Sequence, residues 1–325
     1  MIKKLEVKNF KSIKYLKLYC ERVNIFIGEP NTGKSNILEA LGMLSFISYG
    51  KLKDFVRFET MVNLFHDQNT TESVKIAVDK RVLEMKFEHS RFKGKCSEGG
   101  AYYTGARIFE FDFDYDGTGS RRSVFEGRNI FKFYRFTILH EFKQKEVDFL
   151  LPPCGENLLS VLMSHKELKK MVSNIFKEYG LKMVLKPHEN KIEVQKETDD
   201  MIISYPYSLV SDTLQRIIFH LAAIETNKDS VITFEEPESH AFPYYTKFLA
   251  ERIALDNRNQ YFISTHNPYF LLSVLEKSPK DDIAIFVTYL KGYETQVKPL
   301  NEEDKKEILE AGIDAFFNIE RFLEK

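Results

Sequence analysis

The sequence predicts an α/β fold arranged around a phosphate-binding loop. Short β-rich segments alternate with segments of helical periodicity over the 325 residues, as in proteins that combine helices and strands in one core. Residues 28-GEPNTGKS-35 match G-x-x-x-x-G-K-[ST] and lie between an apolar strand and a helix, where such a loop binds phosphate. A second apolar strand, 231-VITFE-235, is followed directly by another glutamate, and buried carboxylates are costly unless something binds them.

The periodicity of the apolar residues gives the order of the elements. From Lys34 to near Gly50 they recur at helical spacing, and Pro243 suits the first turn of a later helix because its missing N–H needs no partner there. Strands are predicted within residues 2–27 and 74–136, and at 181–185, 191–195, 231–235, 260–264 and 282–289. Further helices are predicted at 155–179, at 212–225, from Pro243 and from about Glu302.

Composition limits the classes of protein that fit. A net charge of −1 gives no overall attraction to nucleic acid or membrane. The three cysteines have no paired spacing, which argues against a disulfide framework or a zinc site and for a reducing compartment. No apolar run approaches the ~20 residues of a membrane span, and the amino terminus lacks the apolar block of a signal peptide. We therefore expect a cytoplasmic protein without a membrane segment.

The phosphate loop predicts how a nucleotide is held. Gly28 and Gly33 let the backbone curl so that its N–H groups face phosphate oxygens, and the helix that follows adds the positive end of its dipole. Lys34 would reach the β- and γ-phosphates, and the Ser35 hydroxyl would bind magnesium. The predicted nucleotide-binding set is Gly28, Asn31, Thr32, Gly33, Lys34, Ser35, Asn36 and, from elsewhere in the chain, Ser211.

The acidic strand predicts a metal ligand and a base. Glu235 would hold Mg²⁺ through a water molecule, and Glu236 would polarise or deprotonate the attacking water. The alternative is a solvated strand end, which the phosphate loop in the same chain disfavours.

Two further residues fit the same chemistry. His266 follows the strand 260–264 and could contact the γ-phosphate or the attacking water, although a lone histidine is more often structural. Ser211 precedes the helix 212–225 and suits either a helix N-cap or a donor to a phosphate oxygen. We predict that His266 is catalytic together with Glu236 and Lys34.

In this order, the motifs GEPNTGKS, VSDTLQR, ITFEEPESH and ISTHNP resemble those of an ABC-type ATPase head within the P-loop NTPases. The resemblance is closest to the stand-alone bacterial ATPases grouped with the overcome-lysogenization-defect and structural-maintenance-of-chromosomes families. It extends to the opening 5-LEVKNFKSI-13, and it places Asn9, Lys11 and Ser12 near the nucleotide.

The resemblance implies a single head with a mixed core sheet, an antiparallel β subdomain and a helical lobe. Lobe I would span about 1–135 and 226–325, and lobe II about 136–225. Two such heads would dimerise around ATP, with Ser211 of each completing the site of the other.

The sequence departs from the family pattern at three places. The metal acid is usually aspartate but is Glu235 here, and Thr213 stands where the signature normally has glycine. The Q-loop glutamine has one candidate, Gln68.

The resemblance implies Mg²⁺-dependent ATP hydrolysis in a prokaryotic defence or DNA-maintenance system. Thr213 and Glu235 motivate an alternative, a slow or non-hydrolysing nucleotide-gated module that regulates a separate effector. A GTPase is rejected because 227-NKDS-230 places its aspartate one position early, and a P-loop kinase would not require Ser211 or His266.

Expected partners follow from what the sequence lacks. It has no long heptad tract for a coiled-coil arm, and the roughly 60 residues after His266 are too few for a TOPRIM nuclease domain. A nuclease or toxin would then be a separate protein, and DNA is a further candidate. Residues 89–145 hold 11 Lys or Arg against 7 Asp or Glu among many aromatics, which suits either nucleic acid or a solvated face with aromatics packed inward.

Overall fold

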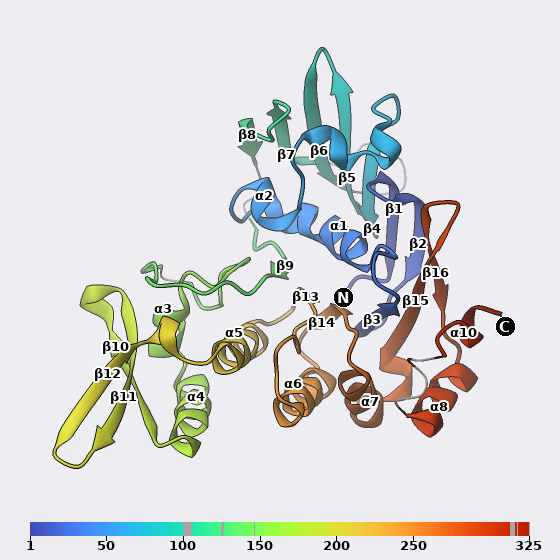
Figure 1. Ribbon diagram of the computed structural model, residues 1–325. Coiled ribbons are helices and arrows are strands. Elements are labelled where there is room, and N and C mark those ends of the chain that lie inside the picture. The colour runs from blue at the N-terminus through green and yellow to red at the C-terminus, as the bar shows by residue number, and fades with distance from the viewer. Residues whose placement is uncertain (100–105, 125–126, 146, 313–315, 317, 325) are drawn as a thin grey trace.

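The described residues form three β-sheets with helices between and beneath them (Figure 1). The computed structural model describes residues 1–99, 106–124, 127–145, 147–312, 316 and 318–324. The mixed α/β fold predicted from the sequence is confirmed.

The central sheet has six strands in the order β16-β15-β3-β14-β13-β9. They are β3 (Val23–Gly28), β9 (Phe131–Tyr134), β13 (Val231–Glu235), β14 (Gln260–Ser264), β15 (Ile283–Lys291) and β16 (Glu294–Pro299). All neighbours are parallel except β16, which runs antiparallel to β15. Parallel strands end at the same edge of the sheet, so the phosphate loop after β3 and the acids at the end of β13 lie at one edge.

A seven-stranded antiparallel sheet covers one face of this core. Its order is β2-β1-β4-β5-β6-β7-β8. The strands are β1 (Lys4–Phe10), β2 (Ile13–Tyr19), β4 (Val74–Val78), β5 (Arg81–Glu88), β6 (Arg91–Glu98), β7 (Ala106–Phe113) and β8 (Gly119–Ser123). Helix α1 (Lys34–Phe46) lies between the two sheets, and one apolar cluster joins all three layers (Figure 1).

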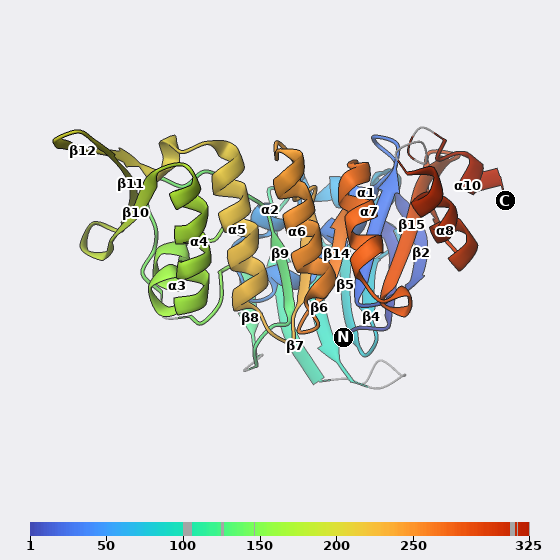
Figure 2. The ribbon, with the colours of Figure 1, turned by 90° about the horizontal axis from the view of Figure 1, so that it is seen from below.

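A row of helices covers the other face of the central sheet (Figure 2). It includes α4 (Lys166–Glu178), α5 (Asp212–Thr226), α6 (Pro243–Leu255), α7 (Pro268–Lys277) and α8 (Glu302–Ala311). Beside α4 lie α3 (Leu158–Ser164) and the sheet of β10 (Leu181–Lys186), β11 (Lys191–Thr198) and β12 (Met201–Pro206). The short helices are α2 (Leu52–Phe55) and α10 (Arg321–Glu324), with 3₁₀ turns at 61–64, 66–68, 187–189, 207–209 and 280–282.

Most of the predicted elements are present, with two kinds of difference. The single helix predicted at 155–179 is two helices, because the backbone is extended at His165. Strands β12 and β16 and helix α7 were not predicted. All residues of β12 are exposed, so the strand lacks the alternation of buried and exposed positions by which a strand is predicted from sequence.

The basic and aromatic segment packs its rings inward. Phe92, Phe109, Phe111 and Phe113 are buried in the antiparallel sheet, and Arg91 pairs with acidic side chains across the strands. Within the described residues of 89–145 this favours the solvated-face alternative over nucleic-acid binding.

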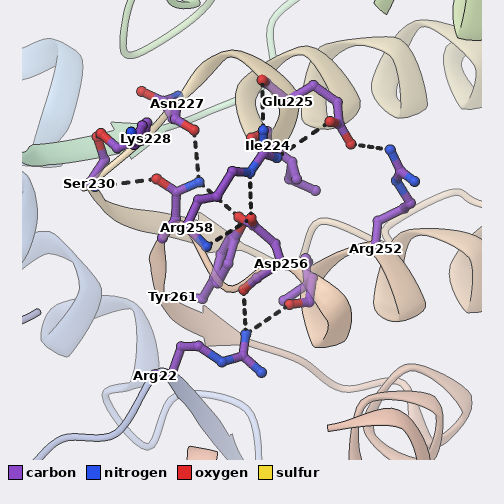
Figure 3. Close-up of polar contacts among 12 residues, drawn as sticks. Arg22, Ile224, Glu225, Asn227, Lys228, Ser230, Arg252, Asp256, Arg258 and Tyr261 are labelled. Atoms are coloured by element: carbon purple, nitrogen blue, oxygen red, sulfur yellow. Dashed lines mark hydrogen bonds and ion pairs between the residues drawn. The ribbon is translucent and has the colours of Figure 1, made fainter. Parts of the chain in front are cut away.

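A polar network holds the opposite edge of the central sheet (Figure 3). Arg22 is buried and donates to the carbonyl oxygens of Ala254 at 2.7 Å and Asp256 at 2.6 Å, where α6 ends. The Asp256 carboxylate accepts from Arg258 at 2.8 Å and from the Tyr261 hydroxyl. This network holds the start of β3 and the start of β14 against the end of α6. The carboxyl ends of the same two strands lie at the candidate site.

Candidate active site

The phosphate loop has the backbone that its glycines predict. Gly28, Asn31 and Gly33 have φ angles of +143°, +64° and +96°, and helix α1 begins at Lys34. The buried Lys34 ammonium donates to the carbonyl oxygens of Gly28 at 2.8 Å and Glu29 at 2.7 Å. Burial lowers the pKa of Lys34 to about 8, against the raising effect of Glu236 and Glu29. A lysine held over a curled loop at a helix start fits a triphosphate.

Threonines from β15 and β16 brace the loop. The hydroxyls of Thr32 and Thr288 are 2.7 Å apart, and a methyl group on Gly28 would lie 2.3 Å from the Thr288 carbonyl oxygen. A methyl group on Gly33 would lie 2.0 Å from Thr295 Oγ1. Both glycines are therefore required by close approach as well as by positive φ.

The turn between β1 and β2 also contacts the start of α1. Asn36 Nδ2 donates to Ser12 Oγ at 2.7 Å, and Ser12 Oγ is 2.6 Å from Thr295 Oγ1. Ser12 therefore lies beside the start of α1, and its place near a nucleotide stays a prediction.

Glu235, the predicted metal acid, is paired with arginine. Arg57 Nη2 donates to Glu235 Oε1 at 3.0 Å, and Arg135 Nη2 lies 4.0 Å from its other oxygen. Arg57 Nε also donates at 2.6 Å to Glu39, which is fully buried and pairs with Lys11 as well. The sequence motifs give no sign of this network, because its members come from different elements.

Glu236 and His266 lie together at the same edge of the sheet. His266 Nε2 is 3.4 Å from Glu236 Oε1, and Ser239 Oγ donates to the other oxygen of Glu236 at 3.2 Å. The φ angle of Glu236 is +44°, an uncommon value for a side chain of this size. Burial and the charge of Lys34 lower the pKa of His266, against the raising effect of Glu236.

Glu238 is a further acid that the sequence reasoning did not single out. It is buried, and it accepts a hydrogen bond from the Thr265 hydroxyl at 2.5 Å while its other oxygen has no hydrogen-bond partner among the described residues. Burial raises the pKa of Glu238 to about 7. The contact ties the segment after β13 to the segment after β14, which carry Glu236 and His266.

Ser211 caps helix α5. Its hydroxyl accepts from the Leu214 N–H at 3.4 Å. Thr213, in place of the usual glycine, donates to the His240 carbonyl oxygen at 2.7 Å. An apolar pocket of about 560 Å³ lies beside both residues.

Asn9 and Gln68, two further candidates, differ in their surroundings. The Asn9 amide donates to the carbonyl oxygens of Asn69 and Glu72, so it holds the chain beside β4. Gln68 is exposed and has a φ of +56°. Its role as the Q-loop glutamine remains a prediction.

The residues present fit a nucleotide and a magnesium ion. At this edge lie Ser264 Oγ and Glu238 Oε2, two buried polar atoms that form no hydrogen bond within the part of the chain that the structure describes. Within the described part of the chain no three His, Cys, Asp or Glu side chains gather to hold a metal. Magnesium in nucleotide sites is held by one or two side chains together with substrate phosphates and waters, and Ser35 and Glu235 are the candidates here.

Residues 1–106 match the family model of the AAA ATPase domain. Residues 169–273 match a model described as AAA domain, putative AbiEii toxin, Type IV TA system. A crystal structure of an Smc head bound to the C-winged helix domain of ScpA has a TM-score of 0.54, with 16% identity over 94% of this chain and 99% of that chain. The chain has the fold of an SMC ATPase head.

A second solved structure agrees with this assignment. The Smc head domain with an extended coiled coil, bound to the C-terminal domain of ScpA and derived from Pyrococcus furiosus, has a TM-score of 0.51. It is 13% identical and covers 95% of this chain and 98% of that chain. No curated protein matches the sequence. The predicted fold, that of an ABC-type, SMC-like head, is confirmed, and two segments of the chain match models of AAA-type ATPase domains.

No helix in the described ranges is both long and apolar enough to cross a membrane.

Proposed function

We propose that this SMC-like head is a Mg²⁺-dependent ATPase that dimerises around ATP. The main support is the proximity of Glu236, His266 and Lys34: the first two are 3.4 Å apart, and the charge of Lys34 acts on both. A carboxylate, an imidazole and a phosphate-binding ammonium at one sheet edge suit in-line attack of water on a γ-phosphate.

Each side chain has one task in this proposal. The loop N–H groups and Lys34 bind the triphosphate, Glu236 takes the proton of the attacking water, and His266 orients that water or the γ-phosphate. Ser35 and Glu235 would hold the magnesium ion. When bound, Mg²⁺ neutralises charge on the phosphate oxygens.

Before Glu235 can serve the metal, it must separate from Arg57. This pairing, together with Thr213, favours the alternative of a slow, nucleotide-gated module that signals by dimerising. Single-turnover rates decide between the two. Wild-type hydrolysis no faster than that of Glu236→Gln would establish the gated module.

The biological setting is proposed by analogy. We propose a cytoplasmic role in prokaryotic defence or DNA maintenance, with a separate nuclease or toxin effector as partner and DNA as a further ligand. Lobe I, about 1–135 and 226–325, and lobe II, about 136–225, would act as one head.

Mass measurement with ATP and Mg²⁺ tests the dimer. Glu236→Gln should bind ATP and double in mass because the nucleotide is not consumed. Ser211→Arg should bind ATP as a monomer, since the larger cation prevents approach of the second copy. Lys34→Ala should lose binding. A Ser211→Arg protein that still dimerises would refute the assignment of Ser211.

A further inference from the structure

The β15–β16 hairpin, whose Thr288 and Thr295 contact the phosphate loop, presents an exposed tyrosine at its tip. Tyr293 is 91% exposed and forms the two-residue turn with Gly292, between the paired residues Lys291 and Glu294. The φ angles of Gly292 and Tyr293 are +60° and +65°. Such turns favour glycine and asparagine, and a bulky residue with positive φ is disfavoured. A ring kept there at a conformational cost points to a function.

The hairpin extends past the phosphate loop. Thr288 of β15 lies opposite Gly28, so β15 continues three residues beyond the end of β3 before it turns. On the way back, Thr295 contacts Gly33 and the Ser12 hydroxyl. Two residues along a strand span about 7 Å, so Tyr293 lies about that far beyond Thr295.

Sheet order places the two ends of a bound nucleotide. Strand β3 has β14 on one side and β15 on the other. Glu236 and His266 lie on the side of β14 and β13, so the γ-phosphate faces that side. The nucleoside must therefore leave the loop toward β15 and β16. Asn36, Ser12 and Thr295 form a hydrogen-bonded path on this second side.

We infer that the β15–β16 hairpin is the base-binding wall of the nucleotide site, with the ring of Tyr293 stacked on the purine. This rests on the proposed function only in that the ligand is a nucleoside triphosphate. Ser12 and Thr295 are positioning residues that hold the hairpin against the loop. Stacking involves only the face of the base, so it should increase the affinity for adenine and guanine nucleotides equally.

The test compares the affinity for Mg-ATP with that for inorganic tripolyphosphate, by calorimetry on the full chain. Tyr293→Asn should weaken ATP binding by about 5- to 150-fold and leave tripolyphosphate within about twofold. Because asparagine suits the turn, the melting temperature should stay the same or rise, which separates loss of stacking from loss of structure. Tyr293→Phe should bind ATP as the wild type does.

Tyr19, an exposed tyrosine on β2, provides the matched control. Tyr19→Ala should leave both affinities unchanged. ATP binding by Tyr293→Asn within about twofold of wild type would overturn the inference alone, as would an equal loss for tripolyphosphate. A folded wild type that binds no ATP would overturn the proposed function as well.

Discussion

Arg57 bridges two carboxylates that differ in burial. Its Nε donates to the buried Glu39 at 2.6 Å, and its Nη2 donates to the half-buried Glu235 at 3.0 Å. Glu39 lies in α1 beneath the site, and Glu235 ends β13 at its rim. Because Glu39 holds the guanidinium independently, Glu235 can leave Arg57 without unpairing it. The acid that we assign to the metal is therefore the exchangeable partner of the pair.

Glu235→Gln should reduce ATP turnover by about 10- to 100-fold at limiting Mg²⁺, since an acid acting on the metal through water is lost. Arg57 keeps Glu39, so the melting temperature should change little. Turnover measured across a magnesium titration provides the check. Glu84→Gln, on the antiparallel sheet and paired with Lys95, is the matched control. An unchanged magnesium dependence in Glu235→Gln would contradict the assignment.

ATP affinity should fall above pH 8. Burial lowers the pKa of Lys34 to about 8, so the ammonium is charged below that pH and loses its proton above it. Above pH 8 the Lys34 side chain must take up a proton when the triphosphate binds. The affinity for ATP should therefore fall by up to about tenfold for each pH unit above 8. Calorimetry between pH 7 and 9.5 should also detect proton uptake. Lys34→Arg stays charged over this range, so its affinity should not change; a flat wild-type curve would be the contrary result.

Glu238 should make the fold less stable as pH rises. Burial raises the pKa of Glu238 to about 7 in the folded chain, so between about pH 4.5 and 7 the folded state binds a proton that the unfolded state has released. The stabilisation of the folded state by that proton is fully present below about pH 4.5 and is lost as the pH rises through 7. Glu238→Gln keeps an oxygen for the Thr265 hydroxyl and never ionises. Its melting temperature should exceed that of the wild type by more at pH 8 than at pH 5; an equal difference would disprove the linkage.

Thr213 should slow hydrolysis and stabilise the start of α5. Thr213→Gly removes the hydrogen bond to the His240 carbonyl oxygen and adds backbone freedom, which should cost about 1–2 kcal/mol of unfolding free energy. Hydrolysis should become faster because the backbone can approach a phosphate more closely. Thr213→Val, which loses only the hydrogen bond, separates the two effects in parallel melting and turnover assays. A Thr213→Gly rate no faster than that of the wild type would show that Thr213 does not limit hydrolysis.

The parts of the site predictable from sequence are those whose strand, loop and helix are contiguous. Residues 28–35 carry their loop geometry locally, and Glu235 and His266 each end an apolar strand that is readable by its composition. Parallel pairing then brings those ends together.

The bracing residues could not be predicted because their partners are distant in sequence. Thr288 and Thr295 meet the phosphate loop more than 250 residues away, through hydroxyls that no motif marks. Arg57 likewise pairs with Glu235, which lies 178 residues further along the chain. Helix α7 was missed although Asn267 caps it and Pro268 opens it, a pattern that the strand signal before it obscured.

The position of β3 between β14 and β15 has a consequence for synthesis. The ribosome completes β3 roughly 230 residues before either neighbour emerges. Until then both edges of β3 lack hydrogen-bond partners. The nascent chain contains Lys34 but not yet Thr288 and Thr295, which contact the phosphate loop. The nucleotide site is therefore completed only late in translation. A chain truncated before Ile283 leaves one edge of β3 unpaired, and such edges promote aggregation.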